Sequence, residues 1–234
     1  QMCIRDRVIK LTKKQLILFL TFITLIIVGI SIISVKATQS NQSRYYVYID
    51  PGHGGFDGGA TSIDKNTIEK DITLCASLYL QNYLERTGIK VKLTRNKDEA
   101  LSKSKKEDIH KRVKYINDSN CDIYISIHAN AYPAESVRGS QTFYNSILEE
   151  NVTLATMIMN QLHQLDASNK RVAKNISGKY ILDHANKVGC LVELGFLTNQ
   201  MDLQNLKNDQ YLQKIAFYIY LGIIHYFEES RHYG

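Results

Sequence analysis

Two histidines and two glutamates stand where they could carry out hydrolytic chemistry together. His53 lies in the glycine-rich segment YIDPGHGGFDGG, directly after a run of strand-forming residues, and His128 ends the run DIYISIH. Glu193 interrupts the otherwise apolar segment CLVELGFL. A catalytic zinc ion typically takes three protein ligands, two histidines and a carboxylate among the known sets, and leaves its fourth position open. These residue types therefore predict a metal site with an acid–base group beside it.

The glycines around His53 do not match a phosphate-binding loop. A dinucleotide-binding GxGxxG pattern from Gly52 would need glycine at Asp57, and a P-loop from Gly54 would need lysine at Ala60. Glycine does allow a backbone to pass close to a metal ion and its substrate. His53 is therefore a candidate ligand, although the loop by itself is equally typical of a tight turn.

Helical periodicity provides a third candidate ligand, Glu69. Residues 69–86 carry apolar side chains at helical spacing from Ile72 to Leu84, on the face that is centred on Glu69. A carboxylate turned toward the core needs a partner to offset its desolvation, and a divalent cation would serve. The alternatives are a capping box with Asn66 or an interaction with the helix dipole.

Each candidate also has an ordinary structural interpretation. His128 could be a hydrogen-bonded core histidine, and Glu193 could form a salt bridge with a neighbouring lysine or arginine. If Glu193 is instead desolvated, its pKa rises toward the range useful for proton transfer. The metal site is favoured because the carboxyl ends of parallel strands meet at one edge of a sheet, which would bring these residues and His53 together.

Strand-like and helix-like segments alternate along the rest of the chain. The expected strands are residues 45–50, 90–94, 122–128, 140–144, 179–182 and 189–194, and the expected helices are residues 69–86, 106–118, 149–165, 201–206 and 209–229. This alternation predicts an α/β fold: a single three-layer domain with a mostly parallel twisted sheet of about six strands flanked by helices.

The first 36 residues are predicted to anchor the chain in a membrane. Residues 16–35 are an uncharged apolar run, about the length of a transmembrane helix, and basic residues cluster before it. We therefore predict a single-pass anchor over residues 1–36, a linker over 37–44, an extracytoplasmic catalytic domain over 45–229 and a tail over 230–234. The alternative is a cleaved signal peptide, which would release a secreted domain.

The formal net charge of +6 does not indicate a nucleic-acid-binding protein. Residues 1–36 hold six basic residues and one acidic residue, which leaves 23 basic against 22 acidic residues in the rest of the chain. Nucleic-acid-binding domains carry a concentrated excess of basic charge. We therefore predict no nucleic-acid partner.

Six segments, in order along the chain, resemble the zinc-dependent N-acetylmuramoyl-L-alanine amidases of bacterial cell-wall metabolism. They are YIDPGHGG, EKDITL, VKLTR, KRVKYIND, SIHANA and VELGFLTN, and the likeness spans residues 45–227. Within the family the chain is most similar to small, membrane-anchored members that act on the spore cortex. Some family members have a long helix after the SIHAN segment that plugs the active site. Here only AYPAESVR separates Asn130 from Gly139, so we expect an open site.

The resemblance implies one Zn²⁺ ion bound by His53, Glu69 and His128, with Glu193 as the catalytic glutamate. It implies hydrolysis of the amide bond between the lactyl group of N-acetylmuramic acid and L-alanine in peptidoglycan, during spore cortex maturation. An activating partner protein is a further expectation. The alternatives are a zinc metallopeptidase that cuts within the stem peptide and an inactive homologue that binds the wall or a partner protein.

Overall fold

The computed structural model describes residues 12–39 and 45–231, with side chains for residues 12–26 and 45–231. The chain divides into two compact units, Gln1–Gln42 and Ser43–Gly234. The first contains helix α1, Lys13–Gln39. No helix in the described part of the chain is long and apolar enough to cross a membrane. The predicted span over residues 16–35 is therefore not confirmed, and its side chains from residue 27 onward lie outside the described residues.

The second unit is built on one six-stranded sheet, in the order β2-β1-β3-β6-β4-β5. The strands are β1 (Tyr46–Pro51), β2 (Lys90–Leu93), β3 (Ile123–Asn130), β4 (Gln141–Tyr144), β5 (Lys174–Asn175) and β6 (Val188–Phe196). Neighbouring strands are parallel except for β4 and β6, which are antiparallel. The prediction of a mostly parallel sheet of about six strands is confirmed.

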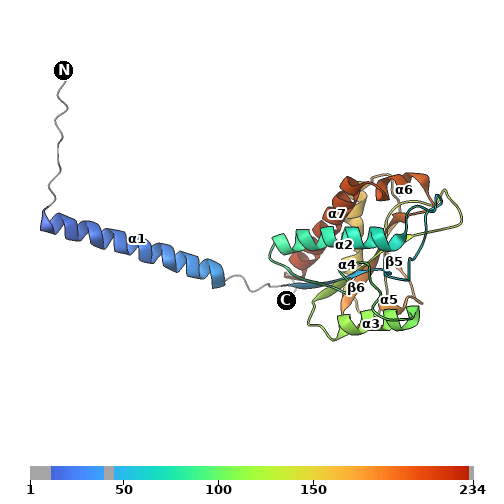
Figure 1. Ribbon diagram of the computed structural model, residues 1–234, viewed down its shortest axis with the longest axis horizontal. Helices are drawn as coiled ribbons and strands as arrows, with labels where there is room; N and C mark the ends of the chain where they lie inside the picture. The colour runs from blue at the N-terminus through green and yellow to red at the C-terminus, as the bar shows by residue number, and fades with distance from the viewer. Residues whose placement is uncertain (1–11, 40–44, 232–234) are drawn as a thin grey trace, which may run out of the picture. The chain divides into compact units, whose positions relative to one another are not determined.

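Helices cover both faces of this sheet and complete the three layers (Figure 1). One face carries α2 (Glu69–Arg86), α4 (Glu150–Leu165) and α7 (Asp209–Ser230), and the other carries α3 (Lys105–Asn117) and α5 (Tyr180–His184). The short helix α6 (Gln200–Leu206) follows β6 and packs against it. Residues 131–140, between β3 and β4, form no helix, as the short segment there predicts.

The alternation of side chains along the strands produces one apolar core on each face. Val47 and Ile49 of β1 join the larger core, together with residues of α2, α4 and α7. Tyr48 points to the opposite face and packs in the smaller core with Tyr124 and Ile116. The apolar stripe predicted along α2 is buried in the larger core. Burial on both faces explains why the strand sequences are almost continuously apolar.

The prediction of a strand at residues 179–182 is wrong. The chain forms helix α5 there, and β5 takes the outer strand position next to β4. The periodicity of a short apolar run does not distinguish a strand from a single helical turn. The helical turn buries both Ile181 and Leu182 in the smaller core, and the Asp183 carboxylate accepts a 2.7 Å hydrogen bond from the N–H of Gly178.

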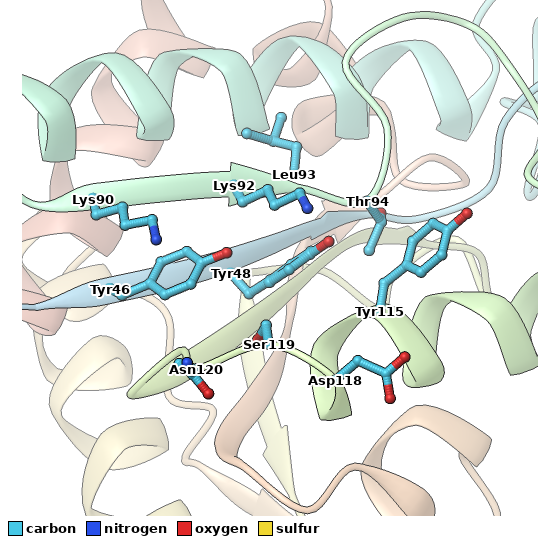
Figure 2. Close-up of a pocket in the computed structure, with 10 residues that line it drawn as sticks. All are labelled: Tyr46, Tyr48, Lys90, Lys92, Leu93, Thr94, Tyr115, Asp118, Ser119 and Asn120. Carbon is cyan, nitrogen blue, oxygen red and sulfur yellow. The ribbon is translucent and has the colours of Figure 1, made fainter.

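The α3 face leaves part of β1 and β2 uncovered. A cavity of about 550 Å³ opens there, between the two strands and the end of α3 (Figure 2). Tyr46 and Tyr48 of β1 lie along it next to Lys90 and Lys92 of β2, because these positions are paired in register and point to the same face. None of the four candidate site residues lines this cavity.

Helices α4 and α7 approach so closely at Gly222 that no side chain fits between them. A Cβ atom at Gly222 would lie 2.5 Å from the Cα atom of Ile158 in α4. Alanine in place of an interior helical glycine ordinarily adds about 1 kcal/mol of stability. For Gly222→Ala we expect instead a loss of about 1–3 kcal/mol in the free energy of unfolding, because overpacking must displace α4.

Urea unfolding of the purified chain measures this loss. Lys214→Ala, at an exposed position of α7, is the control and should change the free energy of unfolding by less than about 0.5 kcal/mol. A Gly222→Ala variant as stable as the wild type would contradict the close helix contact.

Candidate metal centre

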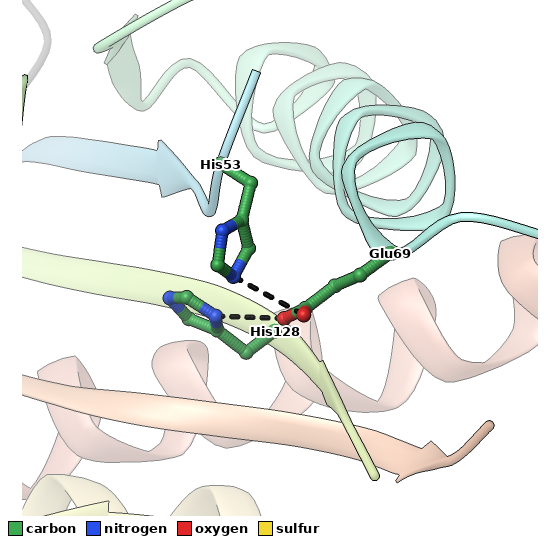
Figure 3. A group of neighbouring side chains, drawn as sticks. All are labelled: His53, Glu69 and His128. Atoms are coloured by element: carbon green, nitrogen blue, oxygen red, sulfur yellow. Dashed lines mark hydrogen bonds and ion pairs between the residues drawn. The ribbon is translucent and has the colours of Figure 1, made fainter. Parts of the chain in front are cut away.

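His53, Glu69 and His128 come together at the carboxyl edge of the sheet (Figure 3). His53 follows β1, Glu69 is the first residue of α2, and His128 lies near the end of β3. The Nε2 atom of His53 is 3.1 Å from Oε2 of Glu69, and Nδ1 of His128 is 2.9 Å from Oε1 of Glu69. One ligand atom from each residue lies within 4.8 Å of the other two. The three residues are therefore close enough to share one ion.

Glu69 is turned into the protein, on the side that the helix periodicity indicates. It is buried, and its carboxylate accepts hydrogen bonds from the backbone N–H groups of Ala60 at 2.7 Å and Ala129 at 3.1 Å. Burial by itself would raise the pKa of this carboxyl, but the hydrogen bonds with the two histidines outweigh burial and lower the pKa. The alternative capping box with Asn66 does not form, because Glu69 is the first helical residue and no side chain caps this terminus.

Glycines beside the histidines make this close approach possible. A Cβ atom at Gly52 would lie 2.4 Å from Cε1 of the His128 ring, and one at Gly59 would lie 2.5 Å from Oε2 of Glu69. His53 itself has a φ of 63°, in the left-handed region that few non-glycine residues adopt. Contacts from elsewhere in the domain must therefore hold this loop.

Two buried arginines hold the backbone that carries His53. Arg112 of α3 donates hydrogen bonds to the carbonyl oxygens of Pro51 at 2.6 Å and His53 at 2.5 Å. Arg95 donates to the carbonyl oxygens of Pro51 at 3.1 Å and Gly52 at 2.9 Å. Hydrogen bonds from a charged donor are about twice as strong as neutral ones. Arg95 and Arg112 thus fix the carbonyl groups of three consecutive residues, Pro51, Gly52 and His53.

Asp50 of β1 balances the charge of Arg112. Its Oδ1 atom is 2.9 Å from Nη1 of Arg112 and accepts a 2.6 Å hydrogen bond from Thr94, while Oδ2 accepts one of 2.8 Å from Ser126. Burial by itself raises the pKa of the Asp50 carboxyl, but Arg112 and the two hydroxyl groups outweigh it and hold the pKa below its usual value. Asp108 pairs with the same guanidinium group at 2.5 Å. The buried network therefore contains both signs of charge.

Asp57 orients the imidazole ring of His53. Its Oδ2 atom is 2.8 Å from Nδ1 of His53, and its Oδ1 atom is 2.6 Å from Nζ of Lys105. A carboxylate at Nδ1 favours the tautomer with its proton on Nδ1, which leaves the lone pair on Nε2. That second nitrogen is the one that faces Glu69. Asp57 thus prepares His53 to act as a ligand.

Four supporting residues are absent from the sequence-based prediction: Asp50, Asp57, Arg95 and Arg112. A carboxylate four residues after a candidate ligand histidine is a usable signal, because ligand histidines are commonly oriented by a second carboxylate. Arg95 and Arg112 lie within the segments VKLTR and KRVKYIND. No local pattern connects either arginine with the loop, since the contact depends on how β2 and α3 pack against β1.

Glu193 of β6 lies beside His128, because the two are paired positions on neighbouring parallel strands. Its side chain is buried, and within the described residues its Oε2 atom has no hydrogen-bond partner. The alternative salt bridge to a lysine or arginine is likewise not observed in this part of the chain. Burial raises the pKa of Glu193 to about 7. A carboxyl group with such a pKa can both accept and donate a proton near neutrality.

The chemistry of the three donors fits a zinc ion. Two imidazole nitrogens and one carboxylate oxygen form a known catalytic zinc set, whereas Ca²⁺ and Mg²⁺ prefer oxygen ligands. Metal binding requires an ionised carboxylate and neutral imidazole. The two histidines hold Glu69 in its ionised form, whereas Glu69 and Asp57 outweigh burial and raise the pKa of His53, so an incoming ion must displace a proton where this ring is charged. The unpartnered oxygen of Glu193 is a buried polar atom that calls for a partner such as a water molecule. The arrangement can therefore hold one ion with a proton-transfer group at its side.

Comparisons with known proteins agree on one family. The family model described as N-acetylmuramoyl-L-alanine amidase matches residues 47–225. The germination-specific N-acetylmuramoyl-L-alanine amidase of Bacillus subtilis (strain 168) is 40% identical over 192 residues, which cover 79% of this chain and 80% of that protein. The solved structure of the CwlD amidase from Clostridioides difficile, in complex with the GerS lipoprotein, is 35% identical with a TM-score of 0.77, and the match covers 79% of this chain and 99% of that chain. The solved structure of the N-acetylmuramoyl-L-alanine amidase AmiC2 of Nostoc punctiforme is 29% identical with a TM-score of 0.71. The match covers 79% of this chain and 97% of that chain.

The buried ion pair of Asp50 and Arg112 predicts a defined dependence of stability on pH. Because the pKa of Asp50 is lower in the folded chain than its unfolded value of about 3.9, its contribution is complete above that value. The contribution is lost as pH falls through the folded pKa. Asp50→Asn removes the charge and should lower the free energy of unfolding by about 3–5 kcal/mol at neutral pH.

Urea unfolding between about pH 7 and pH 2 measures this difference. The difference in free energy of unfolding between wild type and Asp50→Asn should narrow below about pH 4, because Asp50 takes up a proton in the unfolded chain before it does so in the folded chain. Asp118→Asn, which removes an exposed partner of Lys114, is the control and should have little effect. If the difference in free energy of unfolding between wild type and Asp50→Asn were the same at every pH, the charge of Asp50 would not contribute to stability.

Proposed function

The chain belongs to the N-acetylmuramoyl-L-alanine amidase family, and we propose that its active site uses one zinc ion bound by His53, Glu69 and His128. As a member of this family the chain is a hydrolase that acts on peptidoglycan. The proposed reaction cleaves the amide bond between the lactyl group of N-acetylmuramic acid and L-alanine. The main support for the proposal is that His53, Glu69 and His128 lie close together. The buried carboxyl group of Glu193, whose pKa is raised, lies next to His128.

A bound zinc ion supplies Lewis acidity, which polarises the amide carbonyl and acidifies water. Glu193 provides the proton transfers. As a carboxylate it accepts a proton from the attacking water molecule while the new carbon–oxygen bond forms. It then donates that proton to the nitrogen of L-alanine as the carbon–nitrogen bond breaks. The second proton of the water molecule leaves the new carboxyl group and is taken up by the released amine. The products are therefore the lactyl carboxylate and a peptide with an ammonium terminus, and atoms and charge balance.

The remaining residues position these groups. Asp57 keeps the proton of His53 on Nδ1, and Arg95 and Arg112 keep the loop backbone in place. Backbone N–H groups hold the carboxylate of Glu69. Because groups that need not reorganise during the reaction stabilise its transition state best, we propose that this rigid support contributes to catalysis.

We further propose that the chain acts on the spore cortex, outside the cytoplasmic membrane. Support comes from its likeness to the germination-specific amidase of Bacillus subtilis and to the CwlD amidase of Clostridioides difficile. The latter was solved in complex with the GerS lipoprotein, and we propose that a partner protein likewise assists this chain. Peptidoglycan lies outside the membrane, so the site must be exported to reach its substrate.

Substitutions should separate metal binding from proton transfer. Glu193→Gln keeps the three ligands, so we expect normal zinc content with a loss of turnover of about 10²–10⁴-fold, the usual contribution of an acid–base group. His128→Ala removes a ligand and should lose both zinc and activity. Elemental analysis and hydrolysis assays measure the two effects, with His225→Ala on α7 as a control histidine. A Glu193→Gln variant with near-normal turnover would reject its catalytic role.

Product analysis tests the reaction itself. Purified full-length chain is incubated with vegetative peptidoglycan and with spore cortex, with and without a chelator, and the products are identified by mass spectrometry. We expect peptides that begin with L-alanine and glycan with an intact lactyl group, no cleavage after chelation, and recovery when zinc is added back. Cleavage inside the stem would favour the metallopeptidase alternative, and zinc-loaded protein without any cleavage would favour an inactive wall-binding homologue.

A further inference from the structure

The cavity on the α3 face of the sheet is lined by groups that can bind a polar ligand. Its volume is about 550 Å³, and it lies between β1, β2 and the end of α3 (Figure 2). None of the candidate metal-centre residues lines it. We call it the tyrosine cavity, after Tyr46, Tyr48 and Tyr115 in its lining.

Three hydroxyl groups in the tyrosine cavity have no partner among the described residues. They are those of Tyr46, Tyr48 and Tyr115. Tyr48 is only 1% exposed, and a buried hydroxyl normally has a hydrogen-bond partner. Burial raises the pKa of Tyr46 and Tyr48, so both keep their protons at neutral pH. These hydroxyl groups can therefore donate hydrogen bonds to oxygen atoms of a ligand.

The lining of the tyrosine cavity carries an excess of positive charge. Lys90 and Lys92 alternate along β2 and point to the same face as the tyrosines of β1, with which they are paired in register. Nζ of Lys90 lies 4.2 Å from the centre of the Tyr46 ring. Asp118 also lines the cavity, but its carboxylate is paired at 2.5 Å with Lys114, which is not part of the lining. The two lysines therefore favour an anionic ligand.

Protection of the sheet edge does not explain this combination. β2 is an outermost strand, and lysines on such a strand discourage pairing with another sheet. That role requires neither a cavity nor tyrosine hydroxyls without partners. A lipid chain would not suit the lining either, because Leu93 is its one aliphatic residue in the described part of the chain. Tyr115 is 43% exposed, so it offers a ring face on which a flat, polar ligand can stack.

The proposed reaction produces a ligand with these properties. Hydrolysis removes the stem peptide and leaves a carboxylate on the lactyl group of the glycan. A strand stripped of its stems therefore presents sugar rings, hydroxyl groups and a row of negative charges. A strand advances about 3.3 Å per residue, so the lining from Lys90 to Thr94 spans roughly 13 Å. That length accommodates more than one sugar ring.

We propose that the tyrosine cavity is a second glycan-binding site, which holds a strand stripped of its stem peptides by its lactyl carboxylates. This inference rests on the proposed amidase function. Lys90 and Lys92 bind the carboxylates, Tyr115 stacks on a sugar ring, and the tyrosine hydroxyls donate to sugar oxygens. A strand held in this cavity raises the local concentration of uncut stems near the chain.

Binding of defined glycans tests the proposal without turnover. The probes are glycan strands freed of peptides beforehand, the same strands with their lactyl carboxylates converted to amides, and N-acetylglucosamine oligomers, which lack lactyl groups. Calorimetry of the full chain is performed with a chelator present, so that no hydrolysis occurs. The wild type should bind the carboxylate strands most tightly, and added salt should weaken this binding.

Variants separate the contribution of charge from that of stacking. The double variant Lys90→Gln, Lys92→Gln should weaken binding of carboxylate strands about tenfold, at about threefold for each exposed charge pair, and leave amidated strands unchanged. Tyr115→Ser should weaken binding of both strands about fivefold, because it removes apolar contact area. Lys214→Gln and Phe217→Ser alter an exposed lysine and an exposed ring of α7 and should bind like the wild type.

Hydrolysis provides an independent readout. On long peptidoglycan strands the double lysine variant should lower kcat/KM several-fold, mainly through KM, because the second contact with the strand is lost. On a substrate with a single muramoyl group, all these variants should equal the wild type, since the tyrosine cavity is lined by none of the candidate metal-centre residues.

The contrary results are distinct. Equal affinity of the wild type and the double lysine variant for carboxylate strands would overturn the proposal. Equally tight binding of polyglutamate would also overturn it, because the cavity would then attract any polyanion. Lysine-dependent binding to vesicles of anionic phospholipid, without binding of any glycan, would make the cavity a membrane contact instead. If the wild type bound stripped strands but the zinc-loaded chain cleaved no amide bond, the amidase function alone would be rejected.

Discussion

The candidate metal centre depends on the buried ionic network that holds the end of β1. His53 occupies a left-handed backbone conformation within a glycine-rich loop, and neither feature restrains the chain. The restraint comes from Arg95 and Arg112, whose guanidinium groups bind consecutive carbonyl oxygens. Asp50 neutralises this charge inside the protein. Because these groups are buried and satisfy one another, displacement of the histidine would break several strong hydrogen bonds together.

The same edge of the sheet places two glutamates in opposite environments. Burial raises the pKa of Glu69, but His128 and His53 outweigh it and lower the pKa, so Glu69 remains ionised and suited to bind a cation. Glu193 is buried, its Oε2 atom has no hydrogen-bond partner among the described residues, and burial raises its pKa to about 7. Pairs of titratable groups whose environments separate their pKa values commonly divide acid–base work between them. The fold thereby gives two chemically identical side chains different proposed roles.

The candidate site residues lie in or next to the loops at this edge of the sheet. The loop before α2 ends at Glu69, and the segment after β3 begins three residues beyond His128. In open α/β sheets, ligands bind beyond the carboxyl ends of the strands. In this domain the segments that follow β3 and β6 lie at that edge. The tyrosine cavity lies on the α3 face and is lined by other residues. Cavity size alone is therefore a poor guide to the position of the metal centre.

Local sequence patterns were sufficient to predict the fold class and the candidate site residues. The alternation of strands and helices indicated the layered α/β fold, and the periodicity of α2 indicated that Glu69 faces inward. Residue types, together with positions at predicted strand ends, indicated His53, His128 and Glu193 as the other candidate site residues. The tertiary structure decided which distant segments meet: it places the two arginines on the His53 loop, and it leaves Oε2 of Glu193 without a hydrogen-bond partner among the described residues. It also decided that residues 180–184 form a helix. The physical reason is that periodicity records which side of an element is apolar, whereas hydrogen bonding and desolvation depend on which elements pack together.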